Sequence, residues 1–78
     1  MTRYFFNLSG DPYKLDGEGT DLQDITAAKS HAILCAARFM KDSPSELVNG
    51  RGISLEVTDE RGLILCVVNV YVTNPPAD

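Results

Sequence analysis

The chain has 78 residues, of which 44% are hydrophobic and 23% are charged, a composition typical of one folded domain and not of a disordered segment. Its formal net charge is −4, and its seven Lys and Arg residues are scattered along the chain. Phosphate backbones and anionic membrane surfaces attract clustered positive charge, so we expect neither nucleic acid nor a membrane as a partner.

The N-terminal residues lack the basic segment and apolar run of a signal peptide, and no stretch approaches the roughly 20 apolar residues of a membrane span. A cytoplasmic location is therefore expected. Cys35 and Cys66 are too few for a disulfide framework and are expected to be reduced, as small buried hydrophobic residues. A redox pair would require their Cα atoms to lie within about 7 Å of each other.

The first periodic stretch covers residues 3–8 and predicts a strand, because apolar residues alternate along it. A turn is expected at residues 9–13, which contain Gly and Pro. Residues 13–19 predict a short second strand at a sheet edge, since two glycines interrupt it. The first strand presents one apolar set to the core: Tyr4, Phe6 and Leu8.

A helix is predicted from an N-cap at either Asp21 or Asp24 to near Asp42, where Ser43 and Pro44 end it. Residues 43–52 carry no periodic signal and are expected to form a loop. The polar side of the helix includes His31. At 100° per residue one apolar side gathers the following residues: Ile25, Ala28, Ala32, Ile33, Ala36, Phe39 and Met40.

Residues 53–58 alternate as a half-buried strand, and residues 59–62 form a four-residue hairpin loop in which Gly62 takes the left-handed conformation. If Thr58 faces Leu63, every inward residue of this strand meets an apolar residue of the next strand. The predicted pairs are Val57 with Ile64, Leu55 with Cys66, and Ile53 with Val68.

The pattern predicts one α+β domain over residues 1–74 in the order β-β-α-β-β, with a short tail at residues 75–78. The sheet is antiparallel, has three to four strands, and carries the helix on one face. The tail contains two prolines, which exclude it from a central strand.

In the predicted register, the outer face of the last strand is also apolar, although one helix can cover only one face. Phe5 would join this face if the first and last strands were neighbours. We therefore expect a partner interface made of Phe5, Leu63, Leu65, Val67 and Tyr71. Pairing at an open sheet edge is a second route to association. The alternative is a monomer in which residues 13–19, the 43–52 loop or the tail cover these side chains.

Three segments, RYFFNL, DGEGTDLQDITAAKSHA and LEVTDERGLILCVV, resemble in their order a family of small bacterial proteins, common in rhizobia, that is classed as a domain of unknown function. Its members open with R-Y-[FY]-F-H-L and close on an E-V-x-D-x-x-G-x-[VI]-L hairpin. The resemblance spans residues 3 to about 70 and implies a compact α+β domain. This chain has Asn7 where the family usually has His, so no role of that His is carried over.

Acidic residues cluster at Asp16, Glu18, Asp21 and Asp24, but their spacing departs from that of a calcium-binding EF-hand loop. No catalytic residue, metal ligand or cofactor site is assigned from the sequence. We favour a non-enzymatic interaction module that self-associates or binds a protein partner. The alternative is a small ligand-binding or metal-binding domain, or an enzyme, that uses residues 16–24 and His31.

Overall fold

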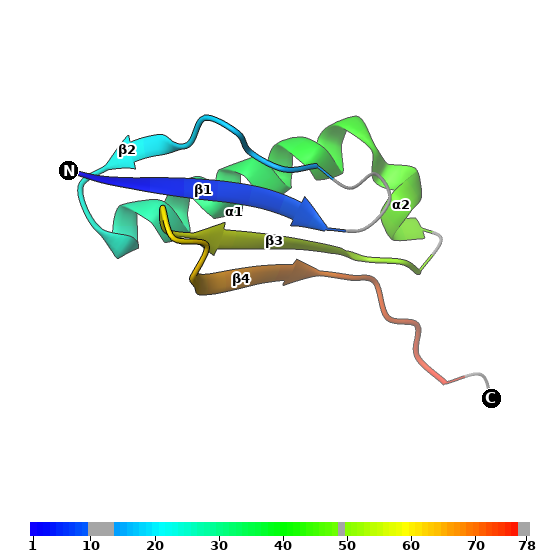
Figure 1. The fold of residues 1–78 in the computed structure, drawn as a ribbon. Coiled ribbons are helices and arrows are strands. Elements are labelled where there is room, and N and C mark those ends of the chain that lie inside the picture. Colours follow the sequence, from blue (N-terminus) through cyan, green and yellow to red (C-terminus); the bar gives the residue numbers. More distant parts are fainter. Residues whose placement is uncertain (10–13, 49, 77–78) are drawn as a thin grey trace.

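The computed structural model describes residues 1–9, 14–48 and 50–76. These residues form a four-stranded antiparallel sheet in the order β2-β1-β3-β4, with α1 lying across one face (Figure 1). This arrangement is the α+β fold that the sequence predicts. Most of the turn expected at residues 9–13 falls outside the described residues. The elements are β1 (Thr2–Ser9), β2 (Thr20–Leu22), α1 (Ile25–Asp42), α2 (Pro44–Val48), β3 (Ile53–Thr58) and β4 (Ile64–Val70).

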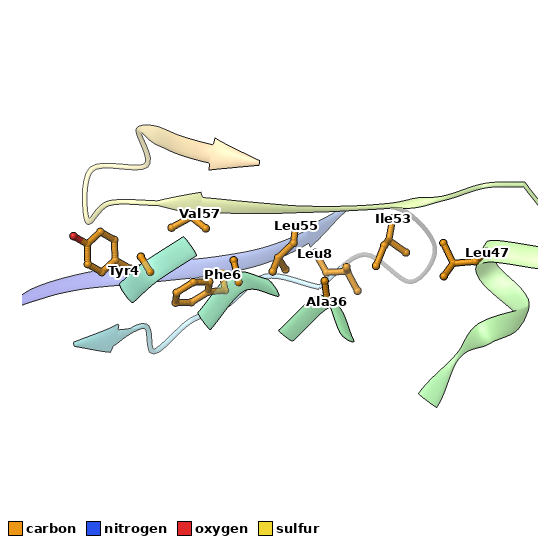
Figure 2. Close-up of a cluster of buried hydrophobic side chains, with 10 residues drawn as sticks. Tyr4, Phe6, Leu8, Ala36, Leu47, Ile53, Leu55 and Val57 are labelled. Carbon is orange, nitrogen blue, oxygen red and sulfur yellow. The ribbon is translucent and has the colours of Figure 1, made fainter. Parts of the chain in front are cut away.

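The core lies between α1 and the two central strands, β1 and β3. Phe6 pairs with Val57 and Leu8 pairs with Leu55, so the inward residues of both strands lie side by side (Figure 2). The predicted alternation of β1 and β3 is confirmed, because the inward residues of both strands are buried and the residues between them are more exposed. The buried strand residues are Tyr4, Phe6, Leu8, Ile53, Leu55 and Val57.

Helix α1 begins after Asp24, whose side chain accepts a hydrogen bond from the Ala27 N–H at 2.9 Å, and it ends at Asp42. Of the two predicted N-caps, Asp24 is therefore the one used. Ala28, Ala32 and Ala36 are fully or almost fully buried, so the helix backbone lies close to the sheet. The prediction that Ile25 and Ile33 are buried is wrong: Ile33 is 58% exposed, because it projects about 100° from Ala32.

The loop prediction for residues 43–52 is partly wrong, because α2 occupies Pro44–Val48. Pro44 is its first residue, a position where the missing N–H of proline costs no helical hydrogen bond. Leu47 is buried and lies beside Ile53 at the end of the core (Figure 2). A helix of five residues is too short for a periodic pattern to appear in the sequence.

The second strand lies at a sheet edge as predicted, but it occupies Thr20–Leu22 and not the described part, residues 14–19, of the predicted range 13–19. Arg3 pairs with Asp21, and Tyr4 pairs with Thr20. Before β2, only Lys14 pairs with β1 among the described residues of this segment, through two backbone hydrogen bonds to Leu8 of 2.8 and 2.9 Å. The chain between these contacts forms a turn around the Asp16 side chain, as described below.

The hairpin between β3 and β4 is confirmed, and Gly62 has a φ of +86° in the left-handed region. Asp59 organises the loop, since its Oδ1 accepts the N–H groups of Arg61 at 2.8 Å and Leu63 at 3.0 Å. The predicted register is wrong by two residues along most of the hairpin. The observed pairs are Val57 with Cys66, Leu55 with Val68, and Ile53 with Val70, and an irregularity pairs Thr58 with Ile64.

Candidate functional site

The outer face of the sheet, opposite α1, is less apolar than the sequence predicts. The register places Asn7, Glu56 and Val67 in one row across β1, β3 and β4. A second row contains Ser9, Ser54 and Asn69, which are all polar, and the Ser9 hydroxyl donates to the Ser54 carbonyl at 3.2 Å. Polar residues of β3 therefore separate the apolar residues of β4 from those of β1.

Apolar side chains gather instead along β4 and its two ends. All seven residues of β4 are described and six of them are apolar, yet none is buried. Cys66, Val68 and Val70 face the core and are half-buried, whereas Ile64 is 52% exposed. We use the name apolar edge for the exposed residues of β4 and its flanks: Leu63, Ile64, Leu65, Val67, Tyr71 and Val72.

Four of the five residues expected at a partner interface lie on the apolar edge. Phe5 does not, because β3 separates β1 from β4 and Thr58 is its neighbour across the strands. A Cβ atom added to Gly19 would lie 2.9 Å from Cε2 of Phe5, so the backbone at Gly19 lies against the Phe5 ring. The chain's own backbone at Gly19 therefore partly covers Phe5.

Sequence reasoning missed Ile64 and Val72 as members of the apolar edge. It assigned Ile64 to the core because strict alternation along β4 put that residue on the same side as Cys66. The irregularity opposite Val57 and Thr58 inserts one residue and reverses the side of Ile64. Neither glycine nor proline marks this position in β4, so the sequence carried no signal for it.

A second feature lies at the β1 edge, where Asp16 holds the turn that leads to β2. Its Oδ2 accepts the Phe6 N–H at 3.1 Å, and its Oδ1 accepts the N–H groups of Glu18 and Gly19, both at 3.0 Å. Asn7 completes the arrangement by accepting the Asp16 N–H at 3.0 Å. The Asp16 carboxylate thus satisfies three backbone donors on the edge of β1 that faces away from β3, where β2 does not pair with Phe6.

These hydrogen bonds determine how Asp16 titrates. Partial burial alone would raise the pKa of Asp16, but hydrogen bonds from the backbone N–H groups of Gly19, Glu18 and Phe6 lower it. The nearby His31 lowers it further, and the net result is a pKa below the ordinary value of 3.8. Asp16 is therefore a carboxylate at neutral pH, which suits an acceptor of three N–H groups.

An open cleft of about 450 Å³ lies between this turn and α1. Phe6, Leu8 and Leu55 line it with apolar surface. The prediction that His31 projects from the polar side of the helix is wrong, because its ring lies 4.5 Å from the Phe6 ring and it is half-buried. The polar residues that line the cleft are Lys14, Asp16, Glu18, Thr20, His31, Arg38 and Asp42.

The structure thus brings together three of the residues that the alternative function would use, Asp16, Glu18 and His31. The other two acidic residues lie elsewhere: Asp21 forms an ion pair of 3.1 Å with Arg3, and Asp24 caps α1. Within the described residues, no three His, Cys, Asp or Glu side chains are grouped closely enough to hold a metal ion.

Both cysteines are free thiols. Burial raises the pKa of the Cys35 thiol above its ordinary value of 9.0, Arg38 acts in the opposite direction, and Asp16 adds to the rise. Cys35 lines the cleft as a neutral thiol at neutral pH, which is a poor nucleophile.

The chain belongs to a family described as a domain of unknown function, DUF6894, whose model matches residues 3–71. The match spans all the strands and helices from Arg3 to the end of β4. No curated protein and no solved structure matches the chain. Among the described residues, no helix is long and apolar enough to cross a membrane.

Proposed function

We propose that this protein is a non-enzymatic interaction module that binds another polypeptide through the apolar edge. The observation that carries the proposal is the contrast between the composition and the burial of β4. Six of its seven residues are apolar, yet three of these are exposed and the other three are only half-buried. In the central strands the apolar residues on the inward side are buried, so the rest of the domain uses such residues for its core.

The position of β4 supports the same proposal. It is an outer strand of the sheet, so one row of its backbone N–H and C=O groups faces away from β3. An extended segment from a partner would satisfy these groups while covering the apolar side chains beside them. The surface proposed here contains Leu63, Leu65, Val67 and Tyr71 from the sequence prediction, together with Ile64 and Val72. Phe5 is left out because β3 lies between it and β4.

The test is site-specific photo-cross-linking in the protein's own cell. A photoreactive phenylalanine analogue replaces Leu63, which is 63% exposed at the apolar edge, or Val48, which is 78% exposed on α2 and serves as the matched control. We expect covalent adducts with a polypeptide from position 63 and none from position 48. Absence of adducts at position 63, or equal adducts at both positions, would overturn the proposal.

A second candidate function is the binding of a small molecule in the cleft beside α1. The cleft favours this candidate because it combines an apolar lining with the charged side chains of Asp16 and Arg38, and its volume is in the usual range for ligand sites. Asp16 is already engaged by three backbone N–H groups, which leaves Arg38 as the more available polar contact.

Thermal unfolding in the presence of a panel of metabolites and divalent metals tests this candidate. A ligand at about 100 times its dissociation constant adds about 2.7 kcal/mol to the free energy of unfolding. The variant Arg38→Ala is expected to lose this stabilisation, whereas Lys29→Ala, on the other flank of α1, is expected to keep it. Stabilisation that survives Arg38→Ala would place the ligand elsewhere.

A further inference from the structure

We propose that the polypeptide bound at the apolar edge is a second copy of this chain, whose β4 pairs with β4 of the first in antiparallel orientation. This inference rests on the proposed function and identifies the polypeptide that binds the apolar edge. Exposed outer strands of monomers are usually protected by Lys or Pro residues or by being short. β4 has seven residues and contains no charged residue and no Pro, whereas the opposite edge, β2, has three residues and carries the Arg3–Asp21 ion pair.

The distribution of charge favours a second copy in the antiparallel orientation. The hairpin loop before β4 contains Asp59, Glu60 and Arg61, whereas residues 71–76 after β4 are uncharged. Antiparallel pairing sets the loop of each copy beside the uncharged segment of the other. The two loops are then separated by about the length of the strand, roughly 24 Å for seven residues. This distance exceeds the screening length of about 8 Å in physiological salt, so the loops do not repel each other appreciably.

The side chains of β4 define the register of this pairing. Residues directly opposite each other in an antiparallel pair lie on the same face of the sheet, so inward residues must meet inward residues. Pairing centred on Val67, the middle residue of β4, satisfies this rule from Leu65 to Asn69 and ends there, because the irregularity turns Ile64 to the face opposite that of Val70. Cys66 then faces Val68 of the other copy on the inner side, and the two Val67 side chains meet on the outer side.

The position of helix α1 favours a second copy of the chain as the partner, rather than a single extended peptide. His31 and Arg38 line the cleft on the β1 side of the helix, and Ile33 lies on the opposite flank, because the helix turns 100° per residue. Ile33 therefore projects on the β4 side, where it is 58% exposed. A second copy in this register places its own α1 on the same face of the joined sheet, so that the Ile33 flanks of the two helices face each other. A bare peptide strand would leave Ile33 exposed.

Sedimentation velocity of the whole chain at micromolar to millimolar concentration tests the proposal. We expect the wild-type protein and Val48→Lys to have the mass of two chains, and Val67→Lys to have the mass of one chain with an unchanged circular dichroism spectrum. A wild-type protein that remains monomeric throughout this range would overturn the dimer, as would a Val67→Lys variant that still forms a dimer.

A disulfide experiment tests the register without relying on dissociation. In a Cys35→Ser, Cys66→Ser background, oxidation of the Val67→Cys variant is expected to link two chains, because directly opposed Cα atoms lie about 4.5–5.5 Å apart. Val48→Cys is the matched control and is expected to remain unlinked. Equal linking of both variants would overturn the register. If the wild type is monomeric while position 63 still yields adducts with a different protein, the dimer fails and the proposed function stands.

Discussion

Asn7 and Asp16 hold the edge of β1 together through a hydrogen bond of 3.0 Å from the Asp16 N–H to Oδ1 of Asn7. Asn7 also donates through Nδ2 to the Thr58 hydroxyl at 3.4 Å, which links the turn at residue 16 to β3. Asn7 of β1 thus connects the turn to β3 through its side chain. A side-chain network takes the place of a strand at this part of the sheet.

Replacing Asp16 removes the acceptor of three backbone N–H groups. We expect Asp16→Ala to lower the free energy of unfolding by about 2 kcal/mol, because hydrogen bonds to a charged group contribute more than neutral ones. Urea denaturation measures the change. Glu18→Ala is the matched control, and it is expected to cost less than about 0.5 kcal/mol because the Glu18 side chain is exposed. Equal effects of the two substitutions would contradict the role assigned to Asp16.

The lowered pKa of Asp16 predicts a dependence of stability on pH. Because the folded pKa lies below the unfolded value, this contribution is fully present above pH 3.8 and is lost as the pH falls through the folded pKa. Denaturation midpoints measured from neutral to acidic pH should therefore decline less steeply below pH 3.8 in Asp16→Asn than in the wild type. Parallel curves for the two proteins would rule out this contribution.

Gly19 combines a φ of +76° with close contacts to Arg3 and Phe5. A Cβ atom at this position would lie 2.9 Å from side-chain atoms of both residues. Strain and crowding together predict that Gly19→Ala lowers the free energy of unfolding by about 2 kcal/mol. Gly17→Ala is the control, since its Cβ would meet nothing within 4 Å, and it is expected to be neutral or slightly stabilising. Thermal or urea unfolding of both variants measures these changes, and equal stabilities of the two variants would contradict the prediction.

The buried alanines set the distance between α1 and the sheet. Ala32 is fully buried, so Ala32→Leu forces the helix outward and is expected to cost about 1–3 kcal/mol. Ala37→Leu adds the same atoms on an exposed position of the same helix and is expected to change stability by less than about 0.5 kcal/mol. Calorimetric melting of the two variants provides the comparison, and a neutral Ala32→Leu would show that the layers are not closely packed.

The elements with clear periodicity could be predicted from the sequence. β1 and β3 show clear alternation of apolar and polar residues, and α1 has an Asp at its N-cap and a Pro after its end. The structure places most ends of these elements within one residue of the predicted bounds. The hairpin was predictable because Gly62 and Asp59 are turn residues. These features depend on local chemistry, which a sequence displays directly.

The features that could not be predicted depend on contacts between distant residues. The irregularity beside Ile64 arises where β4 pairs with β3, and β4 contains no Gly or Pro that would indicate it in the sequence. β2 forms beyond Gly19 and not at residues 14–19, because the Asp16 side chain accepts the N–H groups of Phe6, Glu18 and Gly19 and so holds residues 16–19 in a turn. His31 lies against Phe6 because of where α1 crosses the sheet, which its place on a helical wheel does not reveal. The candidate interface changed for the same reason, since strand order separates Phe5 from Val67.

The order of the strands also constrains when the protein can fold during its synthesis on the ribosome. β1 is made first, but its inner partner, β3, begins only at Ile53, and β1 needs that partner to bury Phe6 and Leu8. Pairing over so long a separation in sequence is slow compared with local hairpin formation. The nascent chain therefore carries an apolar strand without its inner partner until β3 has emerged, and the native sheet is completed only after β4 has been made.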